Sequence, residues 1–249
     1  MKSEPAQLQL DIETSPPTWG GARAGAGRKR IKGRHDADHC RRPDVSPSVP
    51  IHVVLRTRRD VPRLRQGKTY RAIRRALDRT MTRGGAFRVV HTSIQHNHMH
   101  FLVEAEHRDV LTKGMQALAI GAARAINRNY GRHGPVFAYR YHATPITSPK
   151  QMRNALAYVL NNWRRHREDR GHPRASRALV DPYSTGIWFT GWKGMEDRFF
   201  TRPPDYEPLP AANAMSWLMT TGWKQHGLID VRERPGPLRE RDSVRQRGG

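Results

Sequence analysis

The sequence predicts an α+β fold: a ferredoxin-like or RRM-like antiparallel sheet with helices on one face and a tyrosine-bearing helix near the other. Segments typical of strands and helices follow in the order β-α-β-β-α-β, with a further helix after them. Only 36 % of the 249 residues are hydrophobic, which suits one modest core rather than two full domains. Polar and basic extensions flank this core at both ends of the chain.

We expect three regions along the chain. Residues 1–48 form a disordered basic arm, residues 49–167 the folded domain, and residues 168–249 an irregular C-terminal extension with a frayed tail. A short helix is expected at 211–219 within the extension. Its aromatic side chains are expected to pack on the domain: Trp188, Phe189, Trp192 and Trp217.

The first half of the domain reads as a strand, a helix and a hairpin. A short apolar run between proline and charge predicts a strand at 51–57. Apolar residues then recur on one side of a helix at 68–83. Strands at 87–93 and 98–104 flank the turn at 95–97, so they form a hairpin.

The second half reads as a helix, a strand and a final helix. Apolar residues spaced three and four apart predict a helix from Asp109 to Tyr130, and Gly131 can end it. Residues 136–146 are strand-like. The final helix runs from Pro149 to about Arg167, since Ser148 can cap it and proline suits the first helical position.

The charge of the chain predicts a polyanionic partner. Lys and Arg number 45 against 22 Asp and Glu, which gives a formal net charge of +23. Such a balance argues against most small-molecule metabolic enzymes and favours nucleic acid, with an anionic membrane surface as the weaker alternative. The single cysteine excludes an internal disulfide framework, and no apolar run resembles a secretory signal or a membrane span. We therefore expect a cytoplasmic, nucleoid-associated protein.

The basic arm is a candidate DNA contact. Small residues alternate with cations between Gly20 and Arg30, which gives a strip able to lie along a phosphate backbone or in a minor groove. The alternative is a solvated tail with no defined contact. The candidate cations are Arg23, Arg28, Lys29 and Arg30.

Two histidines on one strand are candidate metal ligands. Alternate side chains of a strand point to opposite faces, so His98 and His100 share a face while Met99 points into the core. Two imidazoles a few ångströms apart suit one divalent metal. Ordinary strand histidines on a half-exposed sheet are the alternative.

A tyrosine on the final helix is a candidate nucleophile. Tyr158 lies away from the apolar stripe of that helix, and Asn162 follows it by one turn. A surface or interface tyrosine would be the plainer explanation.

These residues together resemble a known family. The run from Gln95 to Val103, with its histidine–hydrophobe–histidine core, resembles that of the single-tyrosine HUH transposases, and of the REP-associated tyrosine transposases in particular. Three further segments agree in order and spacing: Ala125-Ile126-Asn127, Phe137-Ala138-Tyr139-Arg140-Tyr141-His142, and Ala157-Tyr158-Val159-Leu160-Asn161-Asn162. The resemblance covers about residues 50–167.

The resemblance implies a reaction and its residues. Tyr158 would be the nucleophile, and His98, His100 and Asn162 would hold Mg²⁺ or Mn²⁺. The enzyme would cut single-stranded DNA beside a hairpin through a 5′-phosphotyrosine and rejoin it to another strand. It would act as a monomer or a homodimer, with no membrane partner.

Arginines beside the site are candidate DNA contacts, because cations on the backbone and aromatics under the bases are usual for single strands: Arg140, Arg164 and Arg165. Solvated helix ends are the alternative explanation. Two other functions stay open: a domesticated hairpin-binding protein that no longer cuts, and a replication-initiator or relaxase-type nickase. Intact His98, His100, Tyr158 and Asn162 favour cleavage over the first of these.

Overall fold

The computed structural model describes residues 45–82, 85–170, 178–195, 200 and 206–236. Its elements in chain order are β1 (Ile51–Arg56), α1 (Gly67–Met81), β2 (Phe87–Ile94), β3 (His98–Ala105), α2 (Arg108–Tyr130), β4 (His142–Pro145), α3 (Pro149–Arg165), η1 (Glu168–Arg170), η2 (Thr185–Trp188), α5 (Trp217–Thr220) and η3 (Gly222–His226). Residues 1–44 of the predicted basic arm, which include Arg23, Arg28, Lys29 and Arg30, lie outside the described residues. None of the helices in the described ranges is long and apolar enough to span a bilayer.

The four strands form one antiparallel sheet in the order β2-β3-β1-β4. The second and third strands are adjacent as a hairpin, while β1 lies between β3 and β4, as a split β-α-β repeat requires. In this register Val54 of β1 is opposite His100 of β3 on one side and His142 of β4 on the other. The predicted α+β fold class is confirmed.

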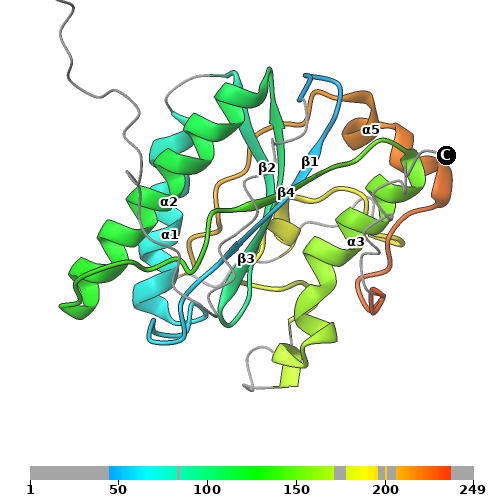
Figure 1. Ribbon diagram of the computed structural model, residues 1–249. Helices are drawn as coiled ribbons and strands as arrows, with labels where there is room; N and C mark the ends of the chain where they lie inside the picture. Colours follow the sequence, from blue (N-terminus) through cyan, green and yellow to red (C-terminus); the bar gives the residue numbers. More distant parts are fainter. Residues whose placement is uncertain (1–44, 83–84, 171–177, 196–199, 201–205, 237–249) are drawn as a thin grey trace, which may run out of the picture. The chain divides into compact units, whose positions relative to one another are not determined.

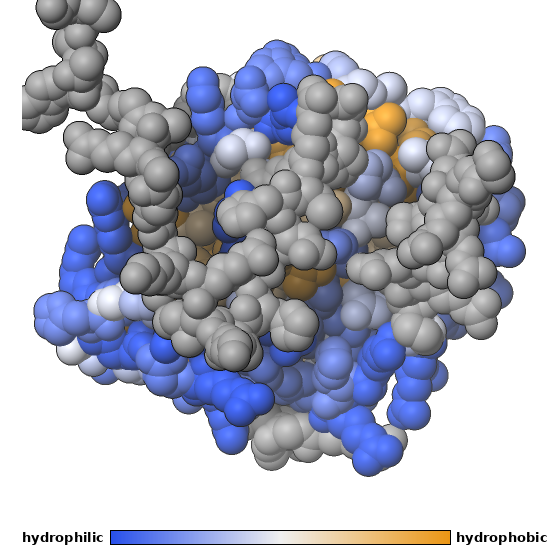
Figure 2. All heavy atoms as spheres, in the orientation of Figure 1, coloured by the Kyte–Doolittle hydropathy of each residue, from blue (hydrophilic) through white to orange (hydrophobic). Residues whose placement is uncertain are grey.

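The sheet is covered on both faces. Figure 1 shows α1 and α2 on one side of the sheet and α3 on the other. Met99, Phe101 and Val103 of β3 are fully buried in the core beneath α1 and α2. Leu102, between them in sequence, belongs to a second core with the apolar stripe of α3. Because side chains alternate along β3, the strand contributes to both cores at once. The surface outside the cores is mainly hydrophilic on the face that Figure 2 shows.

The ends of the two long helices follow from local chemistry. Ser148 is the N-cap of α3, and its hydroxyl accepts a hydrogen bond from the backbone N–H of Gln151. The Gln151 side chain in turn accepts from the backbone N–H of Thr147 at 3.0 Å, so the side chains satisfy two free donors. Gly131 ends α2 in the left-handed conformation, with φ of 59°.

The fourth strand is shorter than predicted. Only residues 142–145 pair along β1, whereas the sequence predicted a strand over 136–146. Phe137 forms an isolated bridge with Thr57, and pairing resumes between His142 and Val54. Between these two pairs the chain advances five residues, from Phe137 to His142, whereas the facing chain advances three, from Val54 to Thr57. The two extra residues interrupt the ladder.

Two helical boundaries also differ. The final helix ends at Arg165 rather than Arg167, because His166 is its cap and Arg167 has a φ of 58°, outside the helical range. Within the predicted helix at 211–219, only residues from Trp217 onward are helical.

Part of the C-terminal extension covers the face of the sheet that carries α3. Phe189 and Trp192 are buried in the second core, as expected. Trp188 and Trp217 are instead 45 % and 54 % exposed, and Trp223, which the sequence analysis did not single out, is buried in their place.

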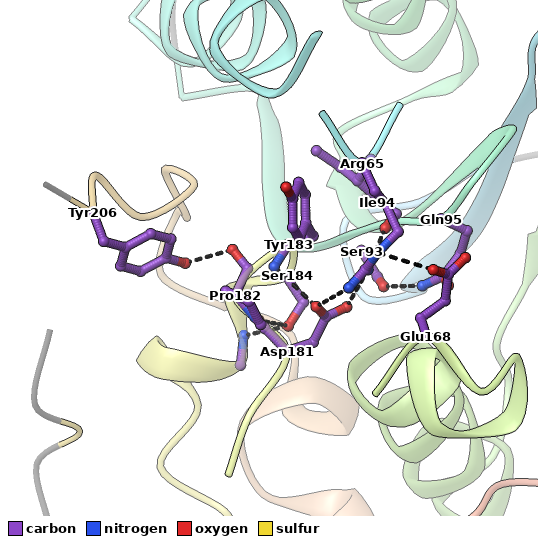
Figure 3. Close-up of polar contacts among 11 residues, drawn as sticks. Arg65, Ser93, Ile94, Gln95, Glu168, Asp181, Pro182, Tyr183, Ser184 and Tyr206 are labelled. Atoms are coloured by element: carbon purple, nitrogen blue, oxygen red, sulfur yellow. Dashed lines mark hydrogen bonds and ion pairs between the residues drawn. The ribbon is translucent and has the colours of Figure 1, made fainter. Parts of the chain in front are cut away.

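A buried ion pair joins this extension to the domain. Figure 3 shows Arg65, in the loop before α1, facing Asp181. The guanidinium donates two hydrogen bonds to the carboxylate, at 2.8 and 2.9 Å, and a third to the carbonyl of Ile94 at 2.8 Å. The Arg65 side chain is 8 % exposed and that of Asp181 is 0 % exposed. Burial removes the water that would otherwise solvate these two charges. Each charge is therefore stabilised largely by the other.

We predict that Asp181→Asn destabilises the fold strongly. The substitution leaves the buried Arg65 guanidinium with only the more distant carboxylate of Glu168, 3.6 Å away, which costs about 3 kcal/mol. Urea unfolding measures the loss. Glu207→Gln is the matched control, since it removes an ion pair in which the Glu207 side chain is 69 % exposed, and should cost less than about 1 kcal/mol. Equal losses in the two variants would contradict this account of Arg65 and Asp181.

A buried histidine makes a second contact with the extension. His91 of β2 lies within hydrogen-bonding distance of the Thr185 hydroxyl, 3.2 Å from its Nδ1, and its ring meets Phe189 edge-on. Burial lowers the pKa of His91 from 6.5 to about 4. The folded protein therefore holds this imidazole neutral at neutral pH.

We predict that His91 makes the fold sensitive to acid. Between its pKa of 6.5 in the unfolded chain and about 4 in the folded protein, the unfolded state binds more protons. The stabilisation is therefore complete above pH 6.5 and is lost as the pH falls toward 4, by roughly 3 kcal/mol for this group. Unfolding free energies at pH 7.5 and 4.5 should differ less in His91→Gln than in the parent, and an unchanged difference would contradict the prediction.

Candidate active site

The candidate site lies on the sheet face that α3 crosses. Because Met99 is buried in the opposite core, β3 presents His98 and His100 together on this face. The centroids of their rings are 4.7 Å apart, with the ring planes nearly perpendicular. His100 is 3 % exposed, while His98 is half-buried nearer the hairpin turn.

The final helix brings the predicted nucleophile to these rings. The ring centroid of Tyr158 lies 5.2 Å from that of His100 in an edge-on arrangement. Tyr158 is half-buried, so its phenol is neither in the core nor fully in solvent. Two turns later on the same helix side, the ring of His166 lies 5.8 Å from that of His98.

Asn162 lies between these two contacts. It follows Tyr158 by four residues and precedes His166 by four, so the three side chains share one face of the helix. Since Tyr158 and His166 both contact the histidines of β3, Asn162 faces the same strand. Its side chain is 0 % exposed, and neither its amide oxygen nor its amide nitrogen has a hydrogen-bond partner among the described residues.

The two histidines of β3 each have one nitrogen in a hydrogen bond. Nδ1 of His98 lies 2.9 Å from Oδ1 of Asn97, and Nδ1 of His100 lies 3.1 Å from Nε2 of His52. Nε2 of His100 is buried and has no partner in the described part of the chain.

Burial also sets the charge of these rings. Burial, helped by the positive charge of Arg56, lowers the pKa of His98 to about 4. Burial and the neighbouring histidines hold the pKa of His100 well below its usual 6.5. Both imidazoles are therefore neutral at neutral pH, which is the form that binds metal ions.

The donor set fits a divalent ion. A buried imidazole nitrogen and a buried amide oxygen without partners are costly unless a further group pairs with them. Imidazole and oxygen donors together suit borderline and hard divalent metals. Among the described residues, no three His, Cys, Asp or Glu side chains are close enough to hold an ion, so Asn162 would have to complete the set with His98 and His100.

The C-terminal extension fixes the helix that carries Tyr158. Arg153 donates to the carboxylate of Glu233, with one bond at 2.7 Å. The amide of Asn161 donates to the Asp230 carbonyl at 2.9 Å, and Arg164 donates to the Val231 carbonyl at 2.8 Å. These contacts lie near the start of α3, at Arg153, and near its end, at Asn161 and Arg164, so the chain at 228–233 holds both ends of the helix.

The predicted DNA-contacting arginines differ in their surroundings. Arg165 is exposed, and its guanidinium lies 5.8 Å from the ring centroid of Tyr158. Arg140 is also exposed, outside the regular part of β4. Arg164 is instead committed to structure, because it donates to two backbone carbonyls of the extension, lies 3.6 Å from Asp169 and stacks on Trp163.

Two residues of this face were not predicted as site residues. Arg56 is opposite His98 in the sheet and is exposed, and His52, four residues earlier on β1, contacts both His100 and Tyr158. Both lie at even positions of β1, and the odd positions Ile51, Val53 and Leu55 are in the core. The alternation of side chains along β1 could therefore have placed both residues on the face opposite this core.

Comparison with known proteins identifies the domain. Residues 46–162 match the family model described as "Transposase IS200 like". A solved structure described as "Structure of the REP associates tyrosine transposase bound to a REP hairpin" is 16 % identical, with a TM-score of 0.42 over 52 % of this chain and 74 % of that chain. No curated protein matches the chain.

The family match agrees with the resemblance seen in the sequence. Residues 46–162 are similar to the IS200-like transposase family.

Proposed function

We propose that this protein is a metal-dependent endonuclease and strand transferase that acts on single-stranded DNA at hairpins. The observation that supports it best is the edge-on contact of Tyr158 with His100, with the unpartnered amide of Asn162 on the next turn of the same helix. A merely structural tyrosine would not need a buried imidazole nitrogen and a buried amide left without partners beside it.

The proposed reaction is a transesterification. The phenolic oxygen of Tyr158 attacks the scissile phosphorus and gives up its proton, and the bond from phosphorus to the 3′ oxygen breaks. That oxygen takes a proton and leaves as a 3′-hydroxyl, while the 5′ phosphate stays on the tyrosine. A 3′-hydroxyl can reverse the step on another strand, so rejoining needs no nucleotide cofactor.

His98, His100 and Asn162 would hold the metal ion, with Mg²⁺ or Mn²⁺ the candidates. When bound, a divalent ion would neutralise charge on a non-bridging phosphate oxygen. The chain itself contributes the placement of Tyr158 and a cation, Arg165, over its ring.

Exposed cations around the site suit a single strand. Arg56 borders His98, Arg165 borders Tyr158, and Arg140 follows the exposed ring of Tyr139. Cations on the backbone and an aromatic ring under a base are the usual means of holding single-stranded nucleic acid. The similar solved structure is described as bound to a hairpin, and we extend that partner class to this chain as part of the proposal.

Replacing the nucleophile tests the chemistry. Tyr158→Phe removes one oxygen and keeps the ring, so the fold and DNA binding should persist while covalent attachment is lost. The assay incubates protein, Mn²⁺ and a labelled single strand that carries a hairpin, and then separates adducts under denaturing conditions. We expect an adduct with the parent and none with the variant.

Tyr130→Phe is the matched control, because Tyr130 ends α2 on the opposite side of the sheet, where its hydroxyl contacts Thr69 and Gln66. It should form adducts as the parent does. Hairpin binding by the parent without any adduct would instead identify a protein that no longer cuts, and an adduct in Tyr158→Phe would move the nucleophile elsewhere.

Removing the metal or a ligand tests the donor set. Chelation by EDTA should abolish adduct formation, and Mn²⁺ or Mg²⁺ should restore it. His98→Ala should slow the reaction by roughly 100-fold or more, because charge stabilisation at the phosphate is worth several kcal/mol.

His96→Ala is the control for this ligand, since His96 is exposed and only two residues away. It should react at the parental rate. Full activity in EDTA, or equal rates for the two alanine variants, would argue against His98 as a ligand.

A further inference from the structure

His52 lies on the same sheet face as the candidate ligands. Val54 is directly opposite His100, and His52 is the next residue of β1 on that face, opposite Leu102. His52 is 8 % exposed and is enclosed by the sheet and α3. Its ring lies nearly parallel to that of His100, with centroids 5.2 Å apart and an interplanar angle of 15°, and it meets Tyr158 edge-on.

The hydrogen bond between the two rings fixes their protons. A hydrogen bond holds one proton, so only one of the two nitrogens joined at 3.1 Å, Nε2 of His52 and Nδ1 of His100, can carry it. If His52 donated, the proton of His100 would lie on Nε2, and this nitrogen could not bind a metal. If His100 donates, its buried Nε2 keeps a free lone pair. Only the second arrangement leaves His100 able to serve as a ligand.

His98 has an equivalent partner. Its Nδ1 lies 2.9 Å from Oδ1 of Asn97, and an amide oxygen can only accept. The proton of His98 is thereby held on Nδ1, and its Nε2 is left as the acceptor. The two candidate ligands thus share one pattern, in which a neighbouring side chain accepts from Nδ1.

We propose that His52 is a positioning residue that accepts the Nδ1 proton of His100 and so holds its Nε2 ready for a metal ion. The role rests on the proposed metal-dependent function. His52 itself is not a ligand in this arrangement, because its Nε2 is occupied by the hydrogen bond to His100. The near-parallel arrangement of the two bonded rings also fixes the plane of the His100 imidazole. Partners of this kind orient the ligands of many metal sites.

Two substitutions of His52 separate positioning from packing. His52→Phe keeps a flat ring against His100 but offers no acceptor. His52→Gln loses the ring, yet its amide oxygen reaches about as far as the Nε2 of histidine and can accept the same proton. His142→Gln is the control, because His142 is exposed and is opposite Val54, on the neighbouring strand β4.

The first readout needs neither metal nor activity. Nitrogen-15 NMR of the metal-free protein reports which nitrogen of His100 is protonated. We expect Nδ1 in the parent, in His52→Gln and in His142→Gln, and a shift of the proton toward Nε2 in His52→Phe. The second readout is Mn²⁺ affinity by titration calorimetry, which should fall roughly 10- to 100-fold in His52→Phe and recover in His52→Gln.

The outcomes separate this role from the proposed function. An unchanged His100 proton and unchanged Mn²⁺ affinity in a folded His52→Phe would overturn the positioning role, even if the parent forms adducts. Loss of affinity in both His52→Phe and His52→Gln would also overturn it, since packing alone would then explain the effect. A parent that binds Mn²⁺ with this dependence but forms no adduct would leave the positioning role supported and remove the proposed reaction.

Discussion

The strand β3 is buried on both of its faces, and the candidate site depends on that constraint. Met99, Phe101 and Val103 anchor one face in the core beneath α1 and α2, while Leu102 anchors the other against α3. A slip of one residue in register would move each of these side chains to the wrong core. The register is therefore strongly fixed, and His98 and His100 are fixed with it beside Leu102.

The helix α3 depends on the chain that follows it. Its apolar stripe packs against the sheet, and the extension supplies both the remaining wall of that second core and the polar contacts at Asn161 and Arg164. The extension is joined to the rest of the domain by the buried pair of Arg65 and Asp181. A chain of contacts thus leads from the loop before α1 to the position of Tyr158.

Much of this arrangement was predictable because its signals are local. Period-two alternation assigned Met99 and the two histidines to opposite faces, and helical spacing separated Tyr158 from the stripe of α3. The Ser148 cap was visible in four consecutive residues. The interruption before β4 was not predictable in this way, since it arises from how Phe137 and His142 pair with a strand about 80 residues earlier.

The features of the site that the sequence did not predict also depend on contacts between distant parts of the chain. His52 lies 48 residues before its partner His100, and no pattern in the sequence around it predicts the contact between the two rings. The tryptophans of the extension carry no periodicity, so composition alone could not separate the exposed Trp188 and Trp217 from the buried Trp192 and Trp223. Arg164 looked like a free cation because the carbonyls that accept from it lie in irregular chain.

The brace on α3 has a consequence for stoichiometry. Both rings of the β3 pair, the phenol and the buried amide come from a single polypeptide, and the segment that holds the helix in place belongs to that polypeptide as well. One subunit therefore carries all of the proposed reacting groups.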